Sequence, residues 1–160
     1  METGVLAFIL RTVHLFATLV WIGGMITNFF IYVPAIRKVL DPAGAGKLMF
    51  VVMNRFKIMV YISIGLLLLT GMISSYIHFT STETIAVTGS WNTLLVIKLS
   101  LFALMSILAI YAFEFLAPRV SATAVKGPSP ELQRLQKTQM IMALLGFIMG
   151  IAIVILSAAL

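Results

Sequence analysis

Long apolar stretches separated by short polar segments dominate the chain. Four of them span about residues 5–36, 58–79, 93–117 and 139–160. Each is long enough to cross a membrane as a helix, since a crossing takes about 20 apolar residues. The pattern predicts an all-α fold, an integral membrane bundle of four transmembrane helices that forms one domain over residues 1–160.

Two of the polar segments carry signals for the start of a helix. Asp41 precedes Pro42, and Ser129 precedes Pro130. A capping side chain followed by proline at the first helical position is typical of a helix N-terminus. We therefore expect the second and fourth helices to begin at these prolines, ahead of their apolar parts.

Composition strengthens the membrane prediction. The chain is 61% hydrophobic and only 10% charged, whereas soluble domains carry roughly 25% charged residues. So little polar surface indicates a lipid bilayer as the surrounding partner. The absence of cysteine from the sequence excludes disulfides and thiolate metal sites. The net charge of +6 does not indicate nucleic acid, because the basic residues flank the apolar stretches.

The distribution of basic residues predicts the orientation of the bundle. Nine of the eleven lysines and arginines flank the first and third connections between the apolar stretches. Basic residues accumulate on the cytoplasmic side of membrane proteins. We therefore expect a multi-pass protein of a prokaryotic cytoplasmic (inner) membrane, with both termini non-cytoplasmic. The nine residues are Arg37, Lys38, Lys47, Arg55, Lys57, Arg119, Lys126, Arg134 and Lys137.

Polar and aromatic residues of the first apolar stretch recur at spacings of three and four. Such residues share one face of an α-helix, and the opposite face is aliphatic or aromatic. We expect this stripe to face the interior of the bundle. Its members are Arg11, His14, Thr18, Trp21, Met25, Asn28 and Tyr32.

The two histidines are predicted to lie at one depth. His14 is 23 residues before Arg37, and His78 is 23 residues after Arg55. Lys98 lies 21 residues before Arg119, within a turn of the same level. With a rise of about 1.5 Å per residue, these groups fall near the outer edge of the membrane.

Two imidazoles, two cations and apolar walls at one level suit a haem b. Imidazole is a common axial ligand of haem iron, so His14 and His78 are the predicted metal ligands. Arg11 and Lys98 would pair with the propionates, and Trp21 would pack against the macrocycle. The plainer interpretation places His78 among the lipid headgroups and has His14 hydrogen-bonded to a neighbouring helix.

Copper is the alternative occupant of such a site. Thioether and imidazole ligands suit Cu(I), and the chain has ten methionines. They are spread along the sequence, however, and methionine in a membrane core usually fills gaps in the packing.

Glu114 has two interpretations as well: an ion pair with Arg119, Arg55 or Lys57, or one station in a proton path.

Several motifs occur together in a recognisable order. His14 is followed by Trp21-Ile22-Gly23-Gly24 and Pro34, Arg55-Phe56 precedes Leu69-Thr70-Gly71, and Trp91 precedes Lys98-Leu99. The ordered set resembles the copper resistance D (CopD) superfamily, which is similar in pattern to the HemJ-type protoporphyrinogen oxidases. The HemJ resemblance implies a four-helix membrane fold, haem b, and a functional pair of His14 and Lys98. The chain departs from HemJ at Asn28–Val33, where that family has an Arg-Leu-Phe-Val-Tyr-His run.

These observations favour a haem-b-binding membrane protein that acts in electron transfer or oxidation at the outer face, together with a redox partner or quinol. A HemJ-like oxidoreductase is one form of this hypothesis, and no catalytic residue is identified. Copper transport or homeostasis, implied by the CopD resemblance, is the first alternative. A cofactor-free accessory subunit of a larger membrane complex is the second. So small a bundle is expected to form a homo-oligomer or to join a complex.

Overall fold

The computed structural model describes residues 2–81 and 89–158, and within these ranges the side chains of residues 2–3, 37, 42–43, 78–81 and 89–92 lie outside the description. Every described element is helical. Four helical stretches, Gly4–Ile36, Gly44–Ile77, Thr93–Ala124 and Pro130–Ala158, are long and apolar enough to cross a membrane. The all-α, four-helix membrane architecture predicted from the sequence is therefore confirmed.

The first and third crossings are each built from three consecutive elements. The first consists of α1 (Glu2–Thr27), the π-helix η1 (Asn28–Tyr32) and α2 (Val33–Val39). The third consists of α4 (Gly89–Tyr111), the π-helix η2 (Ala112–Leu116) and α5 (Ala117–Ala124). The second and fourth crossings are single helices, α3 (Pro42–Ser81) and α6 (Pro130–Ala158).

The second and fourth helices begin at the predicted prolines. At the start of α6, the hydroxyl oxygen of Ser129 accepts a hydrogen bond from the Leu132 amide at 3.1 Å, which is the expected N-cap contact. At the start of α3, the Asp41 carbonyl accepts from the Ala45 amide at 2.8 Å. Gly127, in the turn between α5 and α6, has a φ of 98°, a conformation that glycine adopts without strain.

Each π-helix ends just before a proline. Proline lacks an amide hydrogen, and its ring collides with the carbonyl four residues earlier in an α-helix. The residues preceding Pro34 and Pro118 bond five residues back instead: the Val33 amide donates to the Asn28 carbonyl, and the Ala117 amide donates to the Ala112 carbonyl. The wider turn keeps both crossings continuous, so the third helix extends through Pro118 to Ala124, beyond the predicted end at residue 117.

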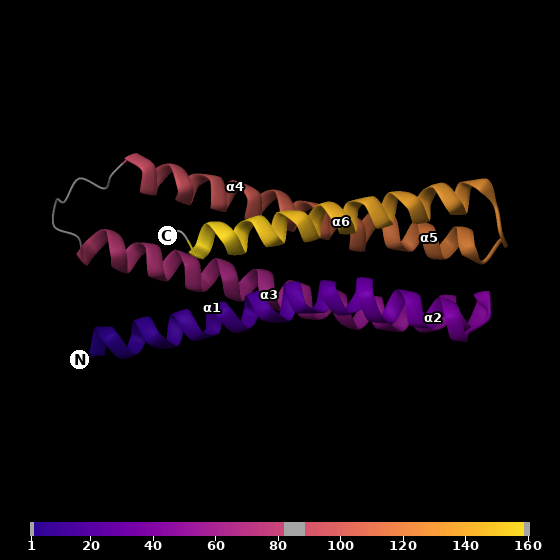
Figure 1. The fold of residues 1–160 in the computed structure, drawn as a ribbon, viewed down its shortest axis with the longest axis horizontal. Coiled ribbons are helices and arrows are strands. Elements are labelled where there is room, and N and C mark those ends of the chain that lie inside the picture. Colours follow the sequence, from indigo (N-terminus) through magenta and orange to yellow (C-terminus); the bar gives the residue numbers. More distant parts are fainter. Residues whose placement is uncertain (1, 82–88, 159–160) are drawn as a thin grey trace.

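The helices pair as two antiparallel hairpins (Figure 1). In the first, α1 packs along α3, and in the second, α4 packs along α6; α1 also contacts α6. The start of α1 and the end of α6 lie at one end of the bundle, and the turns α2–α3 and α5–α6 lie at the other (Figure 1). Large apolar side chains such as Phe8, Leu19 and Met72 are 71%, 67% and 70% exposed, as expected for a surface covered by lipid.

The core lies at the middle of the bundle. Trp21, Met25, Val60 and Met105 form its buried centre. The interior stripe predicted on the first helix is confirmed there, since Trp21 and Met25 are buried and His14, Thr18 and Asn28 are half-buried. The prediction is wrong at both ends of the stripe, because Arg11 and Tyr32 are exposed. Arg11 is exposed although the adjacent Leu10 is only 8% exposed, so the buried face at this level includes Leu10 and not Arg11. Tyr32 lies in the π-helix, whose wider turn changes the spacing of residues after Asn28.

Candidate functional site

His14 on α1 contacts Thr70 on α3. The Nδ1 atom of the His14 ring lies 2.7 Å from the Thr70 hydroxyl oxygen. That hydroxyl also lies 2.6 Å from the carbonyl oxygen of Leu66, one turn earlier on α3. Thr70 is 3% exposed, so this polar contact is enclosed between the two helices.

The Thr70 hydroxyl has a single hydrogen, which determines the direction of these bonds. The Leu66 carbonyl can only accept, so the hydroxyl donates to it and accepts from His14 in turn. The Nδ1 atom of His14 therefore carries the proton in the neutral ring, and the lone pair resides on Nε2. A histidine held through one nitrogen in this way presents the other nitrogen in a fixed direction, as metal-binding histidines do.

The surroundings of the His14 ring are small on one side and positively charged on another. A Cβ atom added to Gly71 would lie 3.9 Å from Cε1 of His14, an ordinary van der Waals distance, so α3 passes close to this edge of the ring. Lys98 is half-buried on α4 and close enough to act electrostatically on His14. The sequence prediction that Lys98 lies near His14 is consistent with this arrangement.

The other predicted members of this site are placed differently. Arg11 is exposed one turn before His14. The His78 side chain lies outside the described residues, as does that of Trp91. Along the backbone of α3, His78 is eight residues beyond Thr70, about 12 Å at 1.5 Å per residue. The register thus sets Thr70 opposite His14, and the pairing of His14 with His78 stays a prediction.

Trp21 lies two turns from His14 in the centre of the protein. Its ring meets Phe102 edge to face, with 6.1 Å between the ring centroids, and it is 2% exposed. The indole is therefore packed against protein side chains. Among the described residues there is no group of three or more His, Asp or Glu side chains that could hold a metal ion.

A second polar cluster joins the two hairpins. The Lys57 ammonium lies 2.6 Å from the Glu114 carboxylate, and the Tyr61 hydroxyl donates to the same oxygen at 2.5 Å. The ammonium also sits 5.6 Å from the centre of the Tyr61 ring, within range of a cation–π interaction. The prediction that Glu114 forms an ion pair is confirmed, with Lys57 as the partner among the three cations considered.

A model of the copper resistance protein D (CopD) family matches residues 50–160. The chain belongs to the CopD family. The resemblance noted in the sequence is thereby confirmed for CopD, whereas the link to HemJ stays a prediction. No curated protein and no solved structure matches the chain.

The CopD match covers α4 to α6 and most of α3, including Thr70, Lys98 and the Lys57–Glu114 pair. It begins after α1, so His14 lies outside the matched range. His14 is nevertheless fixed by Thr70, a residue inside that range. The structure thus connects the unmatched first helix to the CopD region by this hydrogen bond as well as by packing.

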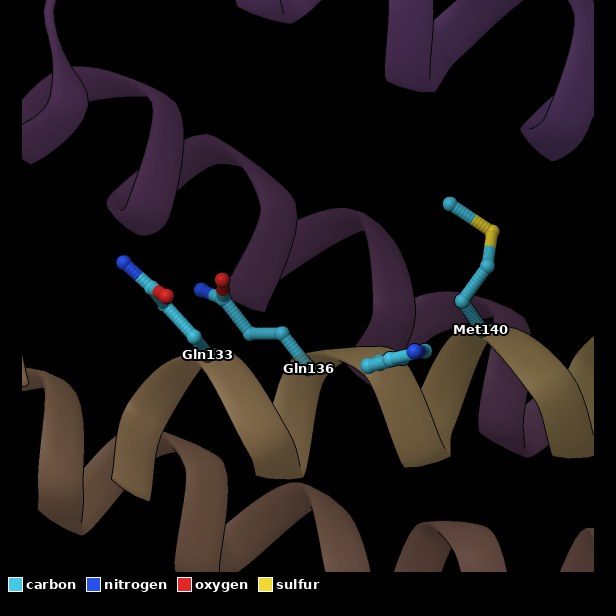
Figure 2. Close-up of a pocket in the computed structure, with 4 residues that line it drawn as sticks. Gln133, Gln136 and Met140 are labelled. Carbon is cyan, nitrogen blue, oxygen red and sulfur yellow. The ribbon is translucent and has the colours of Figure 1, made fainter. Parts of the chain in front are cut away.

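Two surface depressions of this CopD protein lie away from His14. One is lined by Gln133, Gln136, Lys137 and Met140, and Figure 2 shows the labelled side chains projecting from one side of α6. A cleft of about 410 Å³ lies between α3 and the η2–α5 segment, with Lys57 and Phe113 on its wall. The open depression on α6 comes from one helix alone and provides no enclosed site.

Several functional features escape sequence analysis. Thr70 falls in the Leu69-Thr70-Gly71 motif, but its role as the partner of His14 depends on the register of α1 against α3. Tyr61 gives no signal, because a single tyrosine in an apolar helix is common. The π-helices also give none, although the prolines that follow them at positions 34 and 118 are visible in the sequence.

Proposed function

We propose that this protein handles copper(I) in the membrane, as a carrier or homeostasis protein of the CopD family. The observation that carries the proposal is the match of residues 50–160 to copper resistance protein D. Copper(I) accepts imidazole and thioether ligands, and the chain offers both inside its bundle. His14 is the residue we assign as a copper ligand, because its Nε2 atom is directed by the bond from Nδ1 to Thr70.

The proposal includes an orientation. We place the start of α1 and the end of α6 on the outer side of the membrane. Most basic residues flank the α2–α3 and α5–α6 turns, at the opposite end of the bundle, and basic residues accumulate on the cytoplasmic side. His14, in the outer half of α1, would then receive copper from the outside. Lys57 and Glu114 would lie nearer the cytoplasmic face of a prokaryotic inner membrane.

Haem b is the second candidate ligand, and the half-buried Lys98 near His14 favours it. An ammonium beside an axial histidine is suitably placed to pair with a propionate. When bound, haem would supply one-electron chemistry. His14 would ligate the iron through Nε2, with Thr70 holding the ring.

The test uses the detergent-purified protein and the same protein reconstituted in lipid vesicles. We expect anaerobic Cu(I) to bind, and vesicles containing the protein to take up Cu(I) faster than empty vesicles. His14→Ala should lower the affinity by more than about tenfold, as expected when a directed ligand is removed. Thr27→Val is the matched control, because Thr27 bonds only to its own helix, at the Gly23 carbonyl.

A dithionite-reduced absorption spectrum separates the two ligands. A Soret band with sharp α and β bands, lost in His14→Ala, would replace copper by haem as the bound group. A colourless protein that neither binds nor transports copper would overturn both assignments.

A further inference from the structure

Three methionines from three different helices belong to the core or pack against it. Met25 on α1 and Met105 on α4 belong to the buried centre together with Trp21 and Val60, and Met149 on α6 packs against it. Met25 and Met105 are only 8% and 4% exposed. Other methionines, such as Met59, Met72 and Met140, are 48%, 70% and 40% exposed, so this grouping is specific to the core.

The register of the helices brings the three side chains to a common depth. Trp21 meets Phe102, and one turn further along these two helices lie Met25 and Met105. On α6, a Cβ atom added to Gly150 would lie 3.5 Å from the terminal methyl group of Met25, and Met149 is the adjacent residue. The three methionines thus lie at similar levels along the bundle axis, within about one helical turn.

We propose that Met25, Met105 and Met149 form a copper(I) passage site, with the Trp21 indole as one wall. This inference rests on the proposed copper function and names a second station for the same ion. Thioether sulfur is a soft ligand that selects Cu(I) over the hard cations, and an indole face attracts a cation. Neutral thioethers bind without a compensating charge, which suits an ion that must leave again.

Asn28 provides a second, independent observation at this depth. It lies three residues after Met25, at the start of η1. Its Oδ1 atom is buried and makes no hydrogen bond to any described residue. A buried oxygen without a partner is costly in a membrane interior, and a passing cation would be stabilised by its unused lone pairs. The methionine site, with the Asn28 Oδ1 atom about one turn further along α1, would therefore stabilise a cation that moves through the bundle.

The test compares two triple variants of the full-length protein. Met25→Leu/Met105→Leu/Met149→Leu removes the core thioethers with little change in volume. Met59→Leu/Met72→Leu/Met140→Leu makes the same chemical change at exposed positions. The probes are anaerobic Cu(I) and, as a redox-inert substitute, Ag(I), followed by X-ray absorption and by vesicle uptake.

We expect wild type and the exposed-site variant to show sulfur neighbours around the metal and equal uptake. In the core variant the sulfur neighbours should disappear and the uptake should fall by at least about tenfold. His14 should still bind one ion through nitrogen. If the core triple variant does not fold, the three single Met→Leu variants serve, each expected to lower uptake. A variant in which only Trp91 is replaced, Trp91→Phe, adds a readout, since Ag(I) near Trp21 should quench the remaining indole fluorescence.

The outcomes distinguish this proposal from the one on which it rests. Wild type that binds copper with nitrogen neighbours only, or a folded core variant that keeps its sulfur neighbours and its uptake, would overturn the methionine site and leave the copper function in place. Wild type that binds neither Cu(I) nor Ag(I) would overturn both.

Discussion

The Nδ1 atom of His14 donates a hydrogen bond to the Thr70 hydroxyl across 2.7 Å, and that hydroxyl passes its own hydrogen to the Leu66 carbonyl. The three groups form a chain that fixes both the tautomer and the direction of the imidazole.

Thr70→Val removes this chain with almost no change in shape. We expect the copper or silver affinity at His14 to fall by about 10–100-fold, the usual effect of losing the partner of a ligating histidine. Stability should fall by only about 0.6 kcal/mol, typical of a hydrogen bond between membrane helices. Metal titration and thermal unfolding in detergent measure the two effects. Unchanged metal affinity would show that His14 can bind the metal without its hydrogen bond to Thr70.

Lys57 and Glu114 should be energetically coupled. Lys57→Met and Glu114→Gln each remove the ion pair, and the double variant completes a cycle. Because the two side chains are 28% and 42% exposed, we expect only a small coupling energy. Reversible unfolding in detergent or bicelles measures it. Additive effects of the two single variants would mean that the contact contributes nothing to stability.

Gly24 permits the close approach of α1 and α3. A Cβ atom at this position would overlap the Phe56 ring. We expect Gly24→Ala to destabilise the protein by about 1–3 kcal/mol, the usual effect of overpacking. Gly23→Ala is the matched control, because a Cβ there has nothing within 4 Å. A Gly24→Ala variant as stable as Gly23→Ala would contradict this packing. If adding Phe56→Leu to Gly24→Ala restores the lost stability, the packing is supported.

Asn28 should show opposite effects on stability and transport. Asn28→Leu removes a buried acceptor without a partner, so we expect the free energy of unfolding to rise by about 1 kcal/mol. Copper uptake by vesicles should fall, since the oxygen near Met25 is lost. A variant that loses both stability and uptake would indicate that the amide is hydrogen-bonded in the membrane.

The helices could be predicted from the sequence because length and hydropathy alone determine them. The start of α6 was also predictable, since Ser129 and Pro130 are local signals for a helix N-terminus. The Leu132 amide donates the expected capping hydrogen bond to the Ser129 hydroxyl oxygen. The depth count for the site was less accurate. It takes Arg37 and Arg55 to share one level, but α3 begins at Pro42, so Arg55 lies 13 residues inside its helix. The count therefore matches His14 to His78, whereas the register sets Thr70 opposite His14.

The methionine cluster shows a different limit of sequence analysis. Met25 lies on the stripe predicted to face the interior, but Met105 and Met149 lie far away in the chain, on helices whose rotation about their axes the apolar pattern leaves undetermined. Residues 140–156 of α6 are all apolar, and around Met105 on α4 only Ser106 is polar, so periodicity does not distinguish the inward face there. Packing at Trp21, Phe102 and Gly150 defines that face, and these contacts exist only in the folded bundle.

The His14–Thr70 hydrogen bond lies within one hairpin, whereas the Lys57–Glu114 ion pair joins the two hairpins. His14 and Thr70 both belong to the hairpin formed by residues 2–81, so that half contains everything needed to orient the imidazole. Lys57 and Glu114 belong to different hairpins, and their contact exists only when the halves are docked. The orientation of the imidazole is thus a local property of one half of the chain, and the ion pair is a property of the assembled whole.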